Sequence, residues 1–330
     1  MGAACRRDAQ QLARTRPAAS SAAQFAAEEG EKHRRALSRT DHQEDSRRAV
    51  KREAMAGPPD AAWAMVTGDA WAQSHFNFKE LKGAGASGVV VSCEQRPSSN
   101  LPDVPANGPL ALKMPKLPPN PTPDDIDDVE YSTQEEVKMG KEVAGNDNIC
   151  TTYAMFTTLT GPQHQKRFWI VQKGCETTLG VWIDAERAKD IAAGMYGIGV
   201  DKVLLKFYPL LKGVAHMHFK KVAHLDLKAE NVFLTNTETV KIGDFGLSEK
   251  FDASISHHTP QMCTLPYRAP EMLGGKTDYT LEVDMWSLGV MLYAALKGVA
   301  PFKFTLDDDY GRFDLLNEIL RHRRAPPAYL

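Results

Sequence analysis

Residues 224–246, HLDLKAENVFLTNTETVKIGDFG, carry the strongest structural signal in the chain. Two short apolar runs, residues 232–234 and 240–242, enclose a polar turn, and this pattern predicts a β-hairpin. Such a hairpin would hold the side chains of Asp226, Asn231 and Asp244 on one rim. Acidic and amide residues also occur in ordinary polar loops, but two ordered motifs this close together favour a functional site.

Length and composition are those of a soluble globular protein. The 330 residues suffice for one two-lobed domain or two small ones, and 42% are apolar and 25% charged. The formal net charge of -2 gives no indication of a nucleic-acid partner. No apolar run approaches the roughly 18 residues that cross a bilayer. Five cysteines without a C-x-x-C pair indicate neither a zinc site nor a disulfide framework: Cys5, Cys93, Cys150, Cys175 and Cys263.

The N-terminal residues 1–62 differ from the rest of the chain. They are rich in Ala, Arg, Glu, Gln and Ser and nearly lack β-branched and aromatic residues, which predicts disorder. N-myristoylation after Met1 is disfavoured, because Arg6 stands where the signal needs Ser or Thr. The first 27 or so residues, with four arginines and one acid, are similar to a transit peptide. We expect a cytoplasmic protein, with the nucleus and import by this segment as alternatives.

The catalytic loop and the metal-binding turn of eukaryotic-type protein kinases resemble the HLDLKAEN and DFG motifs of this chain. Residues 269–271 (APE) and 284–293 (DMWSLGVMLY) follow in the order of that family. The resemblance covers about residues 76–302 and implies an α+β, two-lobed fold. A small antiparallel β-sheet lobe with one key helix would occupy residues 63–175, and a larger, mainly helical lobe residues 176–330.

Two helices of the large lobe can be placed from the sequence. Apolar residues at spacings of three and four predict a buried helix over residues 203–219, with the set Leu204, Leu205, Tyr208, Leu211, Val214 and Ala215. After residue 302 only one further helix is predicted, at about residues 313–323. Because the family has more helices there, the chain is C-terminally short in comparison or truncated.

A glycine-rich segment follows the first predicted strand, whose alternating pattern is seen in residues 76–78. Gly83, Gly85 and Gly88 form G-x-G-x-x-G, with Val90 close behind. Dinucleotide-binding folds use the same spacing but continue into a helix, whereas residues 89–93 here continue as a strand. The resemblance therefore implies a loop that covers the phosphates of ATP, with Val90 against the adenine.

The other nucleotide contacts are also implied by the resemblance. Lys113 lies in an apolar strand, where an unpaired charge is costly, and would contact the α- and β-phosphates. Its predicted partner on the following helix is Glu136, with Glu135 as the alternative one residue away. Lys173 and Cys175 would form the hinge that binds adenine through backbone groups.

The resemblance also implies a role in phosphoryl transfer for several residues of the catalytic loop and nearby segments. By the kinase template, Asp226 orients or accepts the proton of the substrate hydroxyl, while Asn231 and Asp244 hold Mg²⁺. Lys228 would lie near the transferred phosphoryl group, and Thr264 would bond to Asp226 or Lys228. Both residues are typical of serine/threonine kinases. Glu230 would favour basic protein substrates, or is simply solvated.

One departure from the family concerns regulation. The catalytic loop reads His-Leu-Asp, and Leu225 replaces the arginine that meets an activation-segment phosphate in most regulated members. A phosphate on Ser254, Ser256 or Thr259 would lack that partner, so we expect activity without activation-segment phosphorylation. A catalytically silent pseudokinase scaffold and a small-molecule kinase are the alternative functions.

Overall fold

The computed structural model describes residues 59–85, 88–160, 165–192, 198–251, 264–303 and 309–324. The chain divides into two units, residues 1–58 and 59–330, of which the second is described here. The predicted N-terminal disorder and both targeting signals therefore lie outside the described residues, apart from residues 59–62. So do Cys5, Cys263 and the three hydroxyl residues of the activation segment named above.

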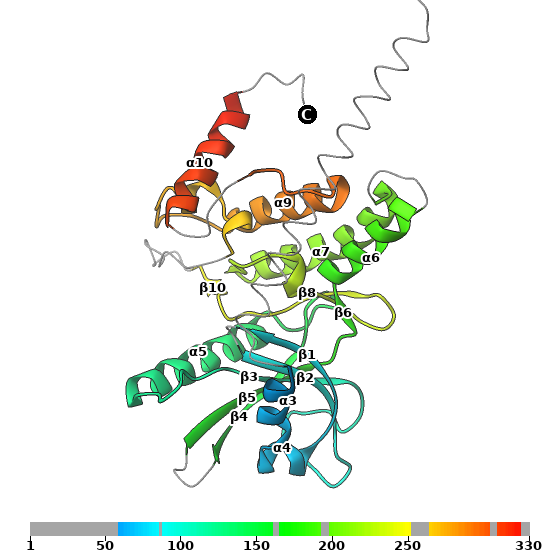
Figure 1. Cartoon of the computed structure of the whole chain (residues 1–330), viewed down its shortest axis with the longest axis vertical. Coiled ribbons are helices and arrows are strands. Elements are labelled where there is room, and N and C mark those ends of the chain that lie inside the picture. Colours follow the sequence, from blue (N-terminus) through cyan, green and yellow to red (C-terminus); the bar gives the residue numbers. More distant parts are fainter. Residues whose placement is uncertain are drawn as a thin grey trace, which may run out of the picture. The chain divides into compact units, whose positions relative to one another are not determined.

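The small lobe is built on a five-stranded antiparallel sheet (Figure 1). The strands follow one another in the sheet in the order β1-β2-β3-β5-β4. Their alternating side chains bury Val89 and Val91 of β2 with Leu110 and Leu112 of β3 in one apolar cluster. The bounds are β1 Phe76–Gly85, β2 Gly88–Gln95, β3 Leu110–Met114, β4 Thr152–Thr160 and β5 Gln165–Lys173.

Helix α5, Pro123–Glu142, packs against β4 and β5 and supplies the one key helix of this lobe. Thr122 and Asp125 form a reciprocal capping box that satisfies free N–H groups of its first turn, and Asp124 adds negative charge at the positive end of the helix. The helix is buried on the side of Glu136, Val137 and Met139. Of the two adjacent glutamates, Glu136 is therefore the one on the buried side of the helix.

Two short helices that the sequence pattern does not predict precede β1, and the first begins inside the segment 1–62 predicted to be disordered. They are α3, Pro59–Thr67, and α4, Ala70–His75. Trp63 packs edge-on against Phe78, and Trp71 contacts Trp169 at 5.8 Å between ring centroids. Both helices are too short to show a periodic pattern, and it is this packing against the outside of the sheet that holds them.

The large lobe is mainly helical, which together with the small lobe gives the predicted α+β class (Figure 1). The predicted hairpin is present, with Val232 paired to Ile242 across β8 and β9. The bounds are β6 Thr177–Thr178, α6 Leu179–Ala192, α7 Val200–Phe219, β7 Val222–Ala223, η1 Ala229–Asn231, β8 Val232–Leu234, β9 Val240–Ile242, β10 Glu249–Lys250, η2 Leu265–Tyr267, α8 Pro270–Leu273, α9 Val283–Lys297 and α10 Asp309–Arg324.

Helix α7 buries a face that shares only Val214 with the set predicted to be buried. Val203, Phe207, Leu210, Val214 and Met217 lie in the core of the large lobe. Of the residues predicted to be buried, Val214 is, at 1% exposure. The others are exposed, with Leu205 at 72%, Tyr208 at 66%, Leu204 at 50% and Leu211 at 43%, and Ala215 exposed as well. Apolar residues cover more than one face of this helix, so periodicity alone could not choose between them.

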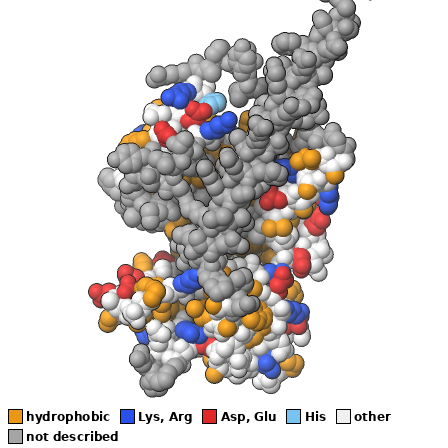
Figure 2. Space-filling view, viewed as in Figure 1, with side chains coloured by type: hydrophobic (Ala, Val, Ile, Leu, Met, Phe, Trp, Pro, Cys, Tyr) orange, Lys and Arg blue, Asp and Glu red, His pale blue; other side chains and the backbone are white. Residues whose placement is uncertain are grey.

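Helix α10 corresponds to the helix predicted at residues 313–323 and packs Leu315 and Ile319 against Leu265 and Leu273. No helix in the described ranges is both long and apolar enough to span a membrane. Side chains of both charge signs are mixed over the described part of the face shown in Figure 2. This agrees with the near-zero net charge.

Candidate active site

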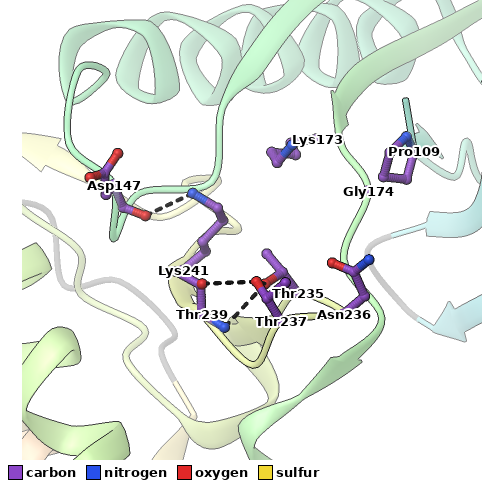
Figure 3. A pocket seen from close by; sticks show the side chains of 9 residues that line it. All are labelled: Pro109, Asp147, Lys173, Gly174, Thr235, Asn236, Thr237, Thr239 and Lys241. Atoms are coloured by element: carbon purple, nitrogen blue, oxygen red, sulfur yellow. Dashed lines mark hydrogen bonds between the residues drawn. The ribbon is translucent and has the colours of Figure 1, made fainter. Parts of the chain in front are cut away.

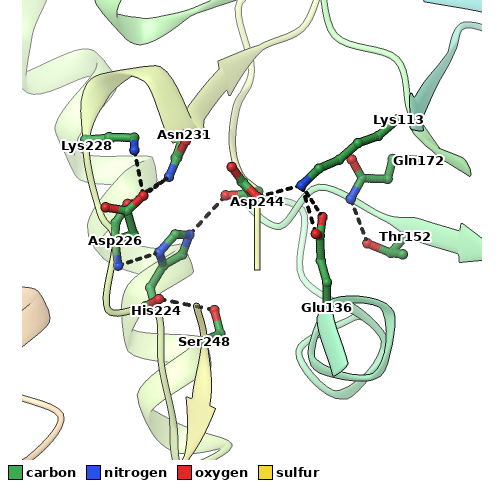
Figure 4. A network of polar contacts seen from close by, with 11 residues as sticks. Lys113, Glu136, Thr152, Gln172, His224, Asp226, Lys228, Asn231, Asp244 and Ser248 are labelled. Atoms are coloured by element: carbon green, nitrogen blue, oxygen red, sulfur yellow. Dashed lines mark hydrogen bonds and ion pairs between the residues drawn. The ribbon is translucent and has the colours of Figure 1, made fainter. Parts of the chain in front are cut away.

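Lys113 connects three elements of the candidate active site (Figure 4). From β3, its Nζ donates to both carboxylate oxygens of Glu136 on α5, at 2.7 and 2.8 Å. It also donates to Oδ1 of Asp244, at 2.9 Å, in the segment after β9. Glu135, the alternative partner, instead pairs with Lys138 on the exposed side of α5. Glu136 is therefore the partner of Lys113 in the structure.

The charges of this cluster support one another. Burial opposes the charge of Lys113, which is 7% exposed, but Glu136 and Asp244 outweigh this effect and raise the pKa of the ammonium. Although burial acts in the opposite direction, Lys113 also keeps the pKa of Asp244 below its ordinary value. Lys113 and Asp244 are therefore both charged at neutral pH.

Asp226 is held by donors on both of its carboxylate oxygens. Oδ2 accepts from Nζ of Lys228 at 2.6 Å and from Nδ2 of Asn231 at 3.0 Å. Oδ1 accepts from the backbone N–H and the hydroxyl of Thr264, at 3.0 and 2.8 Å. Lys228 also donates to the Thr264 hydroxyl at 2.8 Å. Three residues of the catalytic-loop motif and Thr264, which is 33 or more residues away in the chain, form one network.

The backbone of this loop is anchored by Asp284 of α9, which is 1% exposed. Its carboxylate accepts from the N–H groups of His224 and Leu225, at 2.8 and 3.0 Å, and contacts Nε2 of His218 at 2.9 Å. Leu225 has a φ of 65°, a left-handed conformation that is rare for such a residue. The two bonds to Asp284 stabilise it in this position.

The ring of His224 links the loop to the segment that carries Asp244. It is fully buried, and its Nε2 contacts the carbonyl of Gly243 at 3.0 Å. The N–H of Asp226 donates to Nδ1 of the same ring at 3.3 Å, so Nε2 carries the proton. One imidazole thereby sets the positions of Asp226 and Asp244 relative to each other.

Asp284→Asn should lower the free energy of unfolding by about 1–3 kcal/mol, because the amide cannot accept from all three donors and leaves a buried N–H unpaired. Urea unfolding of the two proteins measures the difference. Asp278→Asn, at an exposed position before α9, is the matched control and should change little. Equal stability of Asp284→Asn and the parent would show that the anchor contributes nothing.

The residues present fit a Mg²⁺ ion with its nucleotide. Asp244, with φ at 61°, offers a carboxylate that is 34% exposed. The amide nitrogen of Asn231 is bonded to Asp226, which orients its oxygen away from that contact. Within the described residues no group of three or more His, Cys, Asp or Glu side chains could hold a metal. Mg²⁺ commonly uses one or two protein oxygens and completes its shell with phosphates and water.

The glycine-rich segment has room for a ligand on the side of β1. A Cβ added at Gly83 or Gly85 would meet no atom within 4 Å. Gly88, with φ at 146°, has no such space, because a Cβ there would collide with the Met114 carbonyl. Val90 pairs with Lys113 in the β2–β3 register, so the two predicted contacts lie on adjacent strands. The tip, residues 86–87, is outside the described part.

Residues 76–322 match the protein kinase domain family. The chain belongs to this family. Similar curated proteins include Misshapen-like kinase 1 of Rattus norvegicus, 28% identical over 184 residues, and cyclin-dependent kinase 11B of Homo sapiens, 41% identical over 100 residues. Cell division control protein 2 homolog 3 of Trypanosoma brucei brucei is 36% identical over 121 residues.

Each match covers only part of this chain and only part of the relative. They take in 54%, 30% and 36% of this chain, respectively. The same matches cover 13%, 13% and 38% of the three relatives. The matched part is thus less than two fifths of the length of each of these three relatives.

The hinge of this kinase domain presents a limited set of backbone groups. The N–H of Lys173 donates to the carbonyl of Thr151 at 2.8 Å, and the N–H of Gly174 donates to the carbonyl of Pro109 at 2.9 Å. In the described part of the chain, the N–H of Cys175 has no hydrogen-bond acceptor, so it is available to a ligand. Gly174 is required there, because a Cβ would lie 2.7 Å from the Pro109 carbonyl carbon.

A pocket of about 380 Å³ lies beside the hinge of the kinase domain rather than at the residues predicted to be catalytic (Figure 3). Lys173 and Gly174 line one part of it, and the turn between β8 and β9 lines another. Lys241 crosses its edge and donates to the carbonyl of Asp147 at 2.7 Å. None of the residues predicted to perform catalysis lines this pocket.

His218 is the site residue that sequence reasoning missed. It lies on α7, 66 residues before its partner Asp284, and nothing in its neighbourhood distinguishes it from a surface histidine. A histidine in the last turn of a helix favours the negative end of that helix, which explains its position without any partner. Only the crossing of α7 and α9 brings the pair together.

Proposed function

We propose that this chain is a serine/threonine protein kinase that transfers the γ-phosphate of ATP to protein hydroxyls. The observation that carries the proposal is the pair of networks around Asp226 and Lys113. One positions a carboxylate beside a lysine and a threonine, and the other positions a buried lysine beside Asp244. Their combination supports phosphoryl transfer over nucleotide binding alone.

The chain's own residues would act as follows. Asp226 orients the substrate hydroxyl and accepts its proton, while Lys228 offsets negative charge on the transferred group. Lys113 would bind the α- and β-phosphates, and the carbonyl of Lys173 and the N–H of Cys175 would bond to adenine. Mg²⁺, held by Asn231 and Asp244 when bound, would neutralise charge between the phosphates.

The test is phosphate transfer by the purified full chain to a basic protein such as histone, with ATP and Mg²⁺. Phosphoserine or phosphothreonine in the product is the expected result. Nucleotide binding without any transfer would contradict the proposal and favour a pseudokinase scaffold. Phosphate on a small-molecule alcohol, with none on protein, would favour the small-molecule alternative.

Activity should not depend on phosphorylation of the activation segment. Leu225 is 3% exposed and packs in an apolar cluster with Met272, Tyr279 and Val283, so no cation from this position meets a phosphate. Treatment of the active protein with a broad-specificity phosphatase should leave its rate unchanged. A loss of activity that returns on incubation with ATP would contradict this prediction.

Substrate choice is the finer part of the proposal. Glu230 is exposed in the catalytic loop, immediately before Asn231, where a basic side chain of a substrate would meet it. Peptides with an arginine before the acceptor serine should therefore be phosphorylated faster than matched peptides with alanine. Equal rates for the two peptides would remove Glu230 from substrate recognition.

A further inference from the structure

Two cysteine thiols meet at the hinge. Cys150 lies two residues before β4 and Cys175 two residues after β5, so both lie at the same end of this antiparallel pair. In the pairing of β4 with β5, Thr152 lies opposite Gln172. The hydrogen bond from the N–H of Lys173 to the carbonyl of Thr151 continues this pairing toward the two cysteines. The Cys150 thiol donates to the carbonyl of Lys173, two residues before Cys175, so the two thiols lie in the same neighbourhood.

The two thiols differ in access. Cys150 is 2% exposed, and its N–H donates to the Ile242 carbonyl at 2.7 Å. Its Sγ also contacts the carbonyl of Lys173 at 3.5 Å. Cys175 is partly exposed. A reagent from solution therefore reaches Cys175 first, with Cys150 fixed behind it.

Charge makes Cys175 the better nucleophile. The neighbouring Cys150 thiol lowers the pKa of the Cys175 thiol, burial opposes this, and the ammonium groups of Lys241 and Lys173 add to the lowering. Both lysines line the pocket beside the hinge, where they can attract an anionic reagent (Figure 3). By contrast, burial raises the pKa of Cys93 to about 12. The thiolate is the reactive form of cysteine.

We propose that Cys150 and Cys175 are a dithiol site that small disulfides such as oxidised glutathione convert to an intramolecular disulfide, and that the oxidised hinge binds ATP more weakly. The second part rests on the proposed function, because it takes the hinge as the adenine site. The first part is a property of the thiol pair itself.

The chemistry balances as two thiol–disulfide exchanges. The Cys175 thiolate attacks one sulfur of oxidised glutathione, forms a mixed disulfide and releases one glutathione thiolate, which takes up the proton that Cys175 lost. The sulfur of Cys150 then attacks the mixed disulfide at Cys175. The second glutathione leaves with the proton of Cys150. Two protein thiols are oxidised, and one oxidised glutathione is reduced to two molecules of glutathione.

The disulfide would alter the hinge because its sulfurs must approach to about 2.05 Å, much closer than two sulfurs that are not covalently bonded. Cys150 is held by β9, so Cys175 has to move toward it. The N–H of Cys175 moves with it, and the carbonyl of Lys173 loses the contact to the Cys150 thiol. These are the two backbone groups proposed to bond adenine.

The test is incubation of the full chain with oxidised glutathione, followed by intact mass and peptide mapping. We expect the loss of two hydrogens, a peptide pair linking Cys150 to Cys175, and reversal by dithiothreitol. ATP affinity, measured by calorimetry on the same samples, should fall about tenfold on oxidation, as for one lost hydrogen bond.

Two variants control the experiment. Cys175→Ser should form no disulfide at Cys150, whereas Cys93→Ala, which removes a buried thiol in the small lobe, should oxidise as the parent does. A stable glutathione adduct at Cys175, or a link from Cys175 to Cys5 or Cys263, would overturn the dithiol. An unchanged ATP affinity of the disulfide form would overturn its effect on the hinge. A reduced chain that binds no ATP would contradict the proposed function, while the mapping would still decide the dithiol.

Discussion

Asp226→Asn should lower the rate of phosphate transfer to a protein substrate by about 10²–10⁴-fold, the usual contribution of a positioned general base. The amide cannot accept the proton of the substrate hydroxyl. Its nitrogen would also face Nζ of Lys228 or the hydroxyl of Thr264, which now donate to Asp226 at 2.6 and 2.8 Å. ATP affinity should stay close to that of the parent, because Lys113 and the hinge are untouched.

The measurement is kcat with a serine peptide, alongside ATP affinity by calorimetry. Asp103→Asn is the matched control, since its side chain is 74% exposed and its φ of 62° suits asparagine. That variant should turn over as the parent does. If Asp226→Asn retained the parent's kcat, another group would have to take the proton, and Asp226 would be a structural residue only.

The catalytic loop could be predicted from the sequence because its contacts are short in chain length. Asp226, Lys228 and Asn231 lie within six residues, so the order of residue types constrains their geometry directly. The bonds from Lys228 and Asn231 to Asp226 follow from that spacing. Lys113 could be predicted for another reason: a charge inside an apolar strand requires a partner, and the next helix offers two adjacent glutamates.

The sequence left Glu135 and Glu136 unresolved because one residue of register turns a helical side chain by about 100°. Tertiary contacts make the choice, with Glu136 facing β3 and Glu135 facing Lys138. The same limit explains α7, whose apolar side chains occur on more than one face. The proximity of Cys150 and Cys175 could not be predicted either, because only the pairing of β4 with β5 brings them together.

Helices α3 and α4 show a different limit. Their own sequences contain few cues, and the pattern of β1 begins immediately after them. What holds them is the contact of Trp63 and Trp71 with the sheet and the ion pair of Asp69 with Arg167 at 3.4 Å. Asp69 also caps α4, accepting from the N–H of Ala72. Such partners lie up to about 100 residues away, beyond the reach of a local pattern.

Lys113→Met should lower the free energy of unfolding by about 3–5 kcal/mol, the usual cost of leaving a buried charge without its partner. Glu136 is 6% exposed and receives two of its hydrogen bonds from Lys113. Leaving the charge of Asp244 unpaired costs less free energy, because its side chain is 34% exposed and can be hydrated. Urea unfolding monitored by circular dichroism measures the loss, and phosphate transfer should fall below detection.

The double variant Lys113→Met, Glu136→Leu separates the loss of stability from the loss of phosphate transfer. Replacing both charges by apolar side chains of similar size removes the unpaired carboxylate, so most of the lost stability should return. Phosphate transfer should not return, because no cation is left for the α- and β-phosphates. A double variant as unstable as Lys113→Met would show that Glu136 is not the cause of the loss.

The pH dependence of Lys113→Met checks the same mechanism. Burial raises the pKa of Glu136, and without Lys113 nothing comparable opposes this. A carboxyl with a raised folded-state pKa binds its proton more tightly when folded, so the stability of the variant should fall as the pH rises above the unfolded value of about 4.3. Glu135→Gln, at the neighbouring exposed position, should keep the pH profile of the parent. A flat profile for Lys113→Met would mean that water reaches Glu136 and that the pair is not buried in solution.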